Sequence, residues 1–274
     1  MTPKYVFLDV DGTLVNFKGE IPESAVRAMK LAQNNGHKMI LATGRQKSQI
    51  YSFLTDAIRF DGFLASSSAY IELDGKTVFE SRPTKEGLAF MIDFFEEHHI
   101  PYFLQSTNML YATKDCYERI LAHMRAVGNG ERLLESIFKN TELVENPKSL
   151  TCVEKAAYYE SPFSLEEIRE RLGDYYCVVS YSLGGKHSLY HGEITFEGVN
   201  KATGITRFME AAGAPIYDSI AIGDSGNDLD MIKAAGIGVA MGNASEDIKA
   251  AADLVTRHID DNGIYAAFEA LGLI

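Results

Sequence analysis

The two ends of the chain share a pattern of short apolar runs separated by helical segments. Residues 5–8 and 39–42 are continuous apolar runs, which is the pattern of strands buried on both faces of a sheet. Between them, Pro22 suits a first helical turn and Gly36 suits a helix end, which predicts a helix over residues 22–35.

Further strands extend this pattern. Residues 63–65 predict a third strand, and residues 71–73, which precede an Asp-Gly turn, predict one arm of a hairpin. Near the other end of the chain, the predicted elements are strands at residues 220–222, 237–241 and 254–255 and a helix at residues 228–235. Strands that alternate with helices are joined by crossovers and run parallel. We therefore expect an α/β fold with a doubly wound, Rossmann-like parallel sheet.

The middle of the chain mixes helices with alternating strands instead. Residues 88–95 carry apolar side chains at the spacing of an amphipathic helix, and Ser164 with Glu167 forms a capping box. Residues 175–181 are rich in Tyr and Val, as strands are. This composition predicts an α+β domain inserted into the α/β domain.

Proline and glycine mark the expected ends of the insertion. The predicted hinges are residues 81–83, which contain a proline, and the pair Gly184-Gly185. The prediction is a catalytic core of residues 1–82 and 189–274, and a cap of residues 83–188 that selects the substrate.

Composition narrows the class of protein. The 274 residues carry a formal net charge of −12, and no Lys/Arg-rich cluster stands out, which argues against nucleic acid as a partner. An acidic protein can still bind a phosphorylated metabolite if a cation neutralises the site. No stretch approaches the roughly 20 apolar residues that cross a bilayer, and the first apolar run ends at Asp9. We expect a cytoplasmic protein without a membrane segment.

The first candidate site is Asp9-Val10-Asp11-Gly12-Thr13, directly after the first predicted strand. Ligands of open α/β sheets bind just outside the carboxyl ends of the strands. Two carboxylates this close need a cation or a shared proton. The alternative interpretation is a pair of turn-forming aspartates, because Asp-Gly is a common turn.

Two further candidates are single residues in context. Thr43, followed by Gly44 and Arg45, comes directly after the second strand, where a hydroxyl and free N–H groups can hold phosphate oxygens. A simple helix cap is the alternative. Lys201 starts a helix after the inserted block, and alone it reads as a solvated surface charge.

The last candidate is the sequence Gly223-Asp224-Ser225-Gly226-Asn227-Asp228, which follows the apolar run 220–222. Its acids at i and i+4 can place one carboxylate on a metal and another behind it. The alternative is an N-capped helix start with Asp in its first turn.

In this order, the four candidates resemble the four motifs of the haloacid dehalogenase superfamily over nearly the whole chain. DVDGT is similar to its first motif, Thr43 to its second, Lys201 to its third, and GDSGND to its fourth. The position of the insertion, between the second and third motifs, resembles the Cof-type sugar-phosphatase branch. The sequence departs from that branch at Ala202, where Gly is usual, and at Ser67-Ser68, where Asn-Gly is frequent.

The resemblance implies a phosphatase mechanism. Asp9 is the nucleophile that becomes an aspartyl phosphate, and Asp11 is the general acid and base. Mg²⁺ is expected on the carboxylates of Asp9 and Asp224 and the backbone carbonyl of Asp11, with Asp228 nearby orienting a metal-bound water or Lys201. The groups expected to bind phosphoryl oxygens are Thr43, Lys201, Asn227 and the N–H groups around Val10 and Gly44.

Two other functions stay open at this point. One is a phosphomutase of the same superfamily, and the other is a non-catalytic metabolite-binding protein. An acid two residues after the nucleophile is useful when an alkoxide leaves, which favours the phosphatase over a dehalogenase. The expected substrate is a sugar phosphate or a similar small phosphorylated metabolite.

Overall fold

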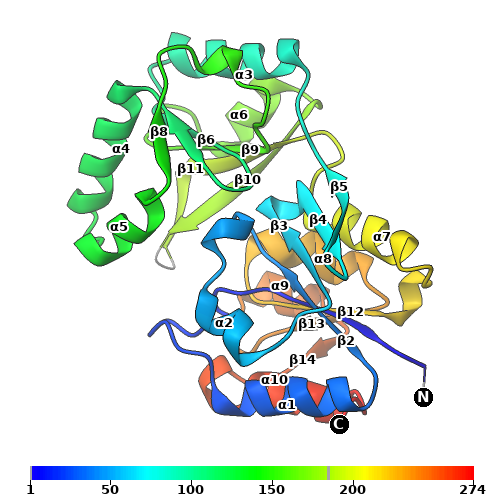
Figure 1. Cartoon of the computed structure of the whole chain (residues 1–274). Helices are drawn as coiled ribbons and strands as arrows, with labels where there is room; N and C mark the ends of the chain where they lie inside the picture. The colour runs from blue at the N-terminus through cyan, green and yellow to red at the C-terminus, as the bar shows by residue number, and fades with distance from the viewer. Residues whose placement is uncertain (1, 184–185) are drawn as a thin grey trace. The chain divides into compact units, whose positions relative to one another are not determined.

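The structure is a computed structural model that describes residues 2–183 and 186–274. Two compact units can be followed by colour along the chain in Figure 1. The first consists of Met1–Arg45, Ile50–Glu80 and Asn200–Ile274, and the second of Gln46–Gln49 and Ser81–Val199.

A largely parallel sheet forms the centre of the first unit. Its order is β14-β13-β12-β1-β2-β3-β4-β5, and only β4 and β5, among the described strands of this sheet, pair antiparallel with their neighbours. Its strands are β1 (Tyr5–Leu8), β2 (Lys38–Ala42), β3 (Gly62–Ala65), β4 (Tyr70–Leu73), β5 (Lys76–Glu80), β12 (Ser219–Gly223), β13 (Ile237–Ala240) and β14 (Leu254–Val255). The predicted parallel sheet and the hairpin are confirmed.

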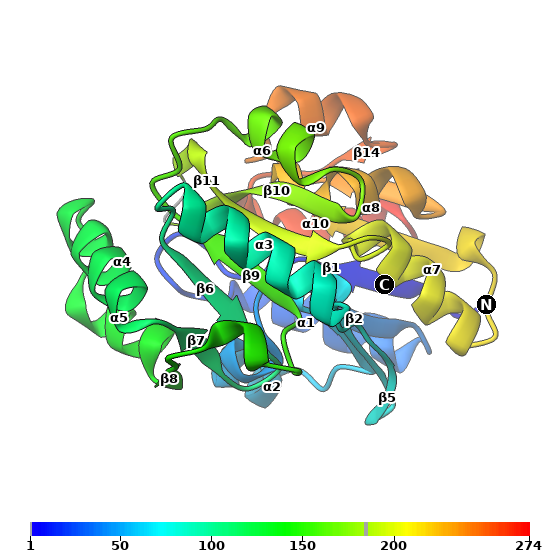
Figure 2. The ribbon, with the colours of Figure 1, turned by 90° about the horizontal axis from the view of Figure 1, so that it is seen from above.

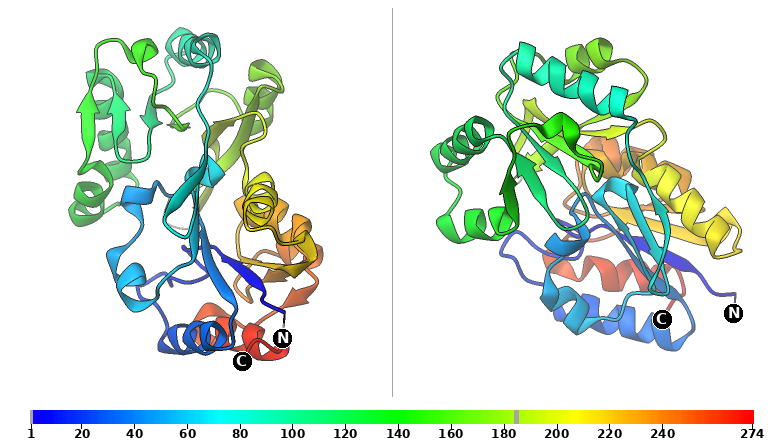
Figure 3. Two further views of the ribbon diagram at one scale, coloured as in Figure 1. Left: turned by 45° about the vertical axis from the view of Figure 1, so that its right-hand side comes forward. Right: turned by 45° about the horizontal axis from the view of Figure 1, so that its top comes forward.

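Helices cover both faces of this sheet (Figure 3). They are α1 (Glu23–Asn34), α2 (Ser52–Ala57), α7 (Lys201–Ala211), α8 (Leu229–Ala234), α9 (Glu246–Ala251) and α10 (Gly263–Ala270), with 3-10 turns η2 (Ser66–Ser68), η4 (Ile216–Asp218), η5 (Gly226–Asp228) and η6 (Ile259–Asp261). Val6 and Leu8 of β1 pack with α1 and α10, whereas Phe7 packs with α7 and α8. Because side chains alternate along a strand, a strand apolar at every position must be covered on both faces.

The second unit has its own mixed sheet, in the order β10-β11-β9-β6-β7-β8. Its elements are η1 (Lys47–Gln49), α3 (Lys85–Glu97), β6 (Tyr102–Gln105), β7 (Leu110–Ala112), α4 (Lys114–Ala126), α5 (Glu131–Phe138), β8 (Thr141–Leu143), η3 (Pro147–Ser149), β9 (Lys155–Tyr158), α6 (Leu165–Leu172), β10 (Tyr176–Leu183) and β11 (Lys186–Phe196). Figure 2 shows α3 lying across the strands. The inserted α+β fold is confirmed.

Several local predictions in the second unit can be checked directly. The apolar face of α3 is buried, and the capping box of Ser164 and Glu167 is present at the start of α6. Tyr102 and Phe103 belong to the hydrophobic core of this unit. The predicted hinge at Gly184-Gly185 lies outside the described residues. No helix among residues 2–183 and 186–274 is long and apolar enough to cross a membrane.

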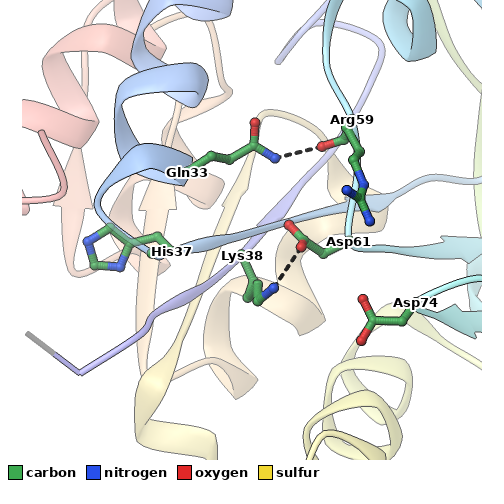
Figure 4. A pocket seen from close by; sticks show the side chains of 7 residues that line it. Gln33, His37, Lys38, Arg59, Asp61 and Asp74 are labelled. Carbon is green, nitrogen blue, oxygen red and sulfur yellow. Dashed lines mark hydrogen bonds and ion pairs between the residues drawn. The ribbon is translucent and has the colours of Figure 1, made fainter.

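A surface hollow of about 330 Å³ lies at the amino ends of β2 and β3 in the first unit (Figure 4). Its lysine, Lys38, is already paired with Asp61 at 2.9 Å, and Asp61 also accepts from the N–H of Met39. This ion pair joins the first residue of β2 to the residue that precedes β3. Ligands of such sheets bind at the carboxyl ends of the strands. The hollow lies at the amino ends, on the opposite side of the sheet from that site.

Candidate active site

Asp9 stands where the strand order of the first unit reverses. The chain adds β2 on one side of β1 and β12 on the other, and ligands of open α/β sheets bind at such a switch point. Asp9 directly follows β1, and its N–H donates to the carbonyl oxygen of Ile222 at 3.0 Å. The residue is only 5% exposed, so its charge needs partners within the protein.

Lys201 supplies the buried positive charge beside Asp9. It is the first residue of α7, whose N-terminus is capped by Asn200 and Thr203. Its Nζ donates to Asp9 Oδ1 at 2.6 Å and to Asp228 Oδ1 at 2.5 Å. Lys201 is 2% exposed and Asp228 is fully buried. The interpretation of Lys201 as a solvated surface charge is wrong.

The loop after β12 wraps around the carboxylate of Asp228. Asp228 Oδ2 accepts hydrogen bonds from the N–H groups of Asp224 and Ser225, both at 3.0 Å. A Cβ on Gly223 would lie 2.5 Å from Asp228 Cγ, so glycine is needed for this close approach. The helix-cap interpretation is correct for Ser225 and Asp228, but the same carboxylate also binds Lys201.

The first and fourth motifs interlock through Asp224. Thr13 donates its hydroxyl hydrogen to Asp224 Oδ1 at 2.9 Å. Gly12 has a φ of 89°, and a Cβ there would lie 2.2 Å from Asp224 Oδ2. Gly12 therefore serves two needs at once, a left-handed backbone and room for a carboxylate. The turn interpretation of Asp-Gly is correct, and the backbone of Gly12 in this turn lies against the carboxylate of Asp224.

This cluster carries more negative than positive charge, because three carboxylates surround one ammonium group. Carboxylate oxygens of Asp9, Asp224 and Asp228 lie within 4.8 Å of one another. Burial, together with the charge of Asp228, raises the pKa of Asp9 well above its usual value and that of Asp224 to about 7. Although burial opposes its charge, the two carboxylates raise the pKa of Lys201. Carboxylate oxygens that repel one another form a donor set that fits a hard divalent cation.

The remaining predicted residues lie in the adjoining loops. Thr43 follows β2, and its Oγ1 accepts from the N–H of Arg45 at 3.1 Å, as a cap does. Asn227 Oδ1 accepts from the hydroxyl of Ser225 at 2.7 Å. Val10 directly follows Asp9 and is buried. Gly44 lies between Thr43 and Arg45, in the loop after β2.

The loop after β3 supports the second motif from its backbone. The N–H of Ser67 donates to the carbonyl oxygen of Thr43 at 3.0 Å, and that of Ser66 donates to the carbonyl oxygen of Arg45 at 2.8 Å. Ser66, Ser67 and Ser68 have φ values of 51°, 56° and 76°. The departure from Asn-Gly therefore leaves a left-handed backbone occupied by serine, which costs more there than glycine.

Asp11 is separate from the buried cluster in its contacts. It is exposed, and both of its carboxylate oxygens accept from the guanidinium of Arg45, at 2.7 and 2.9 Å. Arg45 follows Thr43 and Gly44 in the second motif, but no sequence spacing links it to Asp11. Asn243 was also missed: its amide donates to the carbonyl oxygen of Gly12 at 2.8 Å and supports the first motif.

The comparisons with known proteins agree with this arrangement. The family model described as "haloacid dehalogenase-like hydrolase" matches residues 6–268. The chain belongs to the haloacid dehalogenase-like hydrolases. The predicted resemblance is confirmed, including the Cof-type branch.

Two relatives of this hydrolase are described as a phosphatase and a putative phosphatase. The pyridoxal phosphate phosphatase YbhA of Escherichia coli (strain K12) is 28% identical, with 96% of this chain and 95% of the relative covered. The putative phosphatase YkrA of Bacillus subtilis (strain 168) is 25% identical over the full length of both chains.

Solved structures extend the likeness to the fold. The subclass IIB sugar phosphatase BT4131 has a TM-score of 0.80 and 28% identity, covering 99% of this chain and all of that one. The phosphatase BT1666 of Bacteroides thetaiotaomicron also has a TM-score of 0.80, with 26% identity, covering 99% of this chain and 96% of that one. This hydrolase is thus a phosphatase that acts on phosphoric monoesters.

The substitution Gly12→Ala tests the close approach to Asp224. The methyl group should displace the Asp224 carboxylate and lower phosphatase activity by about 100-fold or more. Gly19→Ala is the matched control, because Gly19 has a φ of 80° but no atom within 4 Å of a Cβ. Backbone strain should cost both variants about 1 kcal/mol of unfolding free energy, and the contact with Asp224 should add to that cost in Gly12→Ala alone. Equal activity of the two variants, measured as phosphate release, would contradict the role of Gly12.

Proposed function

We propose that this hydrolase is a magnesium-dependent phosphatase that hydrolyses a small phosphorylated metabolite through an aspartyl phosphate on Asp9. The observation that carries the proposal is the buried carboxylate of Asp9 at the sheet's switch point, bonded to Lys201. A carboxylate nucleophile divides one slow displacement into two easier steps.

The two steps use the same pair of aspartates. An oxygen of Asp9 attacks phosphorus, the bond to the leaving oxygen breaks, and Asp11 gives that oxygen a proton. A water molecule then attacks phosphorus, loses a proton to Asp11, and releases phosphate and the Asp9 carboxylate. Proton transfer by a positioned group contributes about 10²–10⁴-fold to the rate.

The proposed metal ligands are the carboxylates of Asp9 and Asp224 and the backbone carbonyl of Asp11. Asp228 is already bound by Lys201 and by two backbone N–H groups, which supports a place behind the metal for it. When bound, Mg²⁺ supplies positive charge for the phosphoryl oxygens.

The proposed phosphate-binding groups surround the same point of the sheet. They are Thr43, Lys201, Asn227 and the backbone N–H groups of Val10 and Gly44. Lys201 brings a full charge, whereas the others bring dipoles. Fixed donors of this kind need no reorganisation when charge develops in the transition state.

Substrate choice is assigned to the inserted unit, proposed as a cap of residues 83–188. Supporting this, the unit has its own hydrophobic core and contains none of the residues proposed for chemistry. The relatives act on pyridoxal phosphate and on sugar phosphates, and we propose a sugar phosphate or a similar metabolite here.

A panel of sugar phosphates, pyridoxal phosphate and nucleotide monophosphates, scored by released phosphate, should rank a sugar phosphate first. A higher kcat/KM for the nucleotides would contradict this.

Asp9→Asn should abolish turnover, by about 10³-fold or more, because an amide is a poor nucleophile. Since three carboxylates share one ammonium here, removing one negative charge should leave the melting temperature unchanged or higher. Asp56→Asn, at an exposed position of α2, is the control and should retain full activity. Residual activity of Asp9→Asn above about a tenth of wild type would rule out Asp9 as the nucleophile.

Activity should depend on added Mg²⁺. EDTA should stop phosphate release and Mg²⁺ should restore it, whereas Ca²⁺ should substitute poorly because it prefers more ligands and looser geometry. Mg²⁺ should also raise the melting temperature by binding the native state, and Asp224→Asn should reduce that rise. Full activity in excess chelator would exclude this role for the metal.

Free phosphate as the product, without a transferred phosphoryl group, separates the phosphatase from a phosphomutase.

A further inference from the structure

Asp11 is held by an arginine. Arg45 Nε lies 2.7 Å from Asp11 Oδ2, and Arg45 Nη2 lies 2.9 Å from Asp11 Oδ1. The two parallel bonds form the bidentate geometry that is strongest between guanidinium and carboxylate. The side chain of Asp11 is 52% exposed, so burial alone leaves it free to adopt several rotamers. The guanidinium selects one of them.

Arg45 is itself held by Tyr51 and by its own backbone hydrogen bonds. Its Nη2 donates to the hydroxyl oxygen of Tyr51 at 2.5 Å, and its guanidinium lies 4.1 Å above the ring of Tyr51. Tyr51 in turn stacks on Phe53, with ring centroids 5.0 Å apart. The backbone of Arg45 is bonded to Thr43 and Ser66. A guanidinium stacked on an aromatic face keeps its fork oriented at little further entropic cost.

We propose that Arg45 is the positioning residue for Asp11 and that Tyr51 holds Arg45 in place. This inference rests on the proposed role of Asp11 as general acid and base. A proton donor must lie within hydrogen-bond reach of the reacting oxygen, and an exposed carboxylate without an orienting partner meets that condition only part of the time. Arg45 therefore raises the fraction of molecules in which Asp11 is correctly placed.

The pair is compatible with both steps of the reaction. In the water step, the Asp11 carboxylate accepts one proton from water as the new bond from oxygen to phosphorus forms and the bond to Asp9 breaks. In the first step, a protonated Asp11 can keep one bond to Arg45 through its bare oxygen. Its hydroxyl then gives the proton to the leaving oxygen as the bond from phosphorus to that oxygen breaks.

A comparison of two substrates tests Arg45 in the full-length enzyme with Mg²⁺. The p-nitrophenolate leaving group needs little protonation, whereas the alkoxide from benzyl phosphate needs a proton. Because kcat/KM reports the step in which the leaving group departs, Arg45→Met should lower it by about 10–100-fold for benzyl phosphate and by less than about threefold for p-nitrophenyl phosphate. A purely structural loss lowers both values alike.

Related variants separate this inference from the proposed function. Asp11→Asn should show the same selective loss, and Arg45→Met should add nothing to it in the double variant. Arg59→Met, at another exposed arginine of the first unit, should leave both values unchanged. If Asp11→Asn is selective but Arg45→Met is not, the role of Arg45 is overturned and that of Asp11 stands. If Asp11→Asn spares benzyl phosphate, the proposed role of Asp11 fails, and the inference fails with it.

If Arg45→Met does not fold, two milder variants test the same proposal. Arg45→Lys keeps the charge but loses the bidentate fork. Tyr51→Phe keeps the ring but loses the hydroxyl group that accepts from Arg45 and also donates to Asp11 Oδ1 at 3.4 Å. Both should show a smaller loss of the same selectivity, at an unchanged melting temperature. Wild-type selectivity in both would overturn the proposal.

Discussion

The buried ammonium of Lys201 is the interaction on which the rest of the site depends. It joins Asp9 after β1 to Asp228 after β12, and it comes from the first turn of α7. These three segments are distant in sequence. β1 and β12 are paired in the sheet, and the buried cation links the start of α7 to the residues that follow both strands. Removing Lys201 would leave two buried carboxylates uncompensated, and breaking a buried ion pair in this way commonly costs about 3–5 kcal/mol. The residues of the site thus also contribute to the stability of the first unit.

Close backbone packing makes this concentration of charge possible. The carboxylates of Asp224 and Asp228 occupy the space that a Cβ would take at Gly12 and Gly223. The hydroxyl of Thr13 and two backbone N–H groups then supply hydrogen bonds to the same carboxylates. Glycine stands where the chain must pass beside a carboxylate, so the acidic side chains can occupy these positions only because the turn residues lack a Cβ.

The acids divide into two environments with different physical demands. Asp9 and Asp228 are buried and bonded to Lys201, which suits the proposed nucleophile and the group proposed to support it. Asp11 is half exposed and held by Arg45 alone among the cationic side chains for which a contact to it is described. The proton exchange proposed for Asp11, with water and with the leaving oxygen, requires an accessible group. Its orientation then has to come from a partner, because packing cannot provide it.

The sequence by itself determined the strands, the crossovers and the loops that carry the motifs, because these follow from local periodicity and turn chemistry. It also placed Asp9, Thr43 and Asp224 at one edge of the sheet, since carboxyl ends of parallel strands share that edge. Only the tertiary structure decided that Lys201 is buried, although it lies 192 residues from Asp9. It alone paired Arg45 with Asp11 across 34 residues and placed Asn243 against Gly12. Such partners are chosen by charge, burial and side-chain direction after the chain has folded, and no local spacing in the sequence records them.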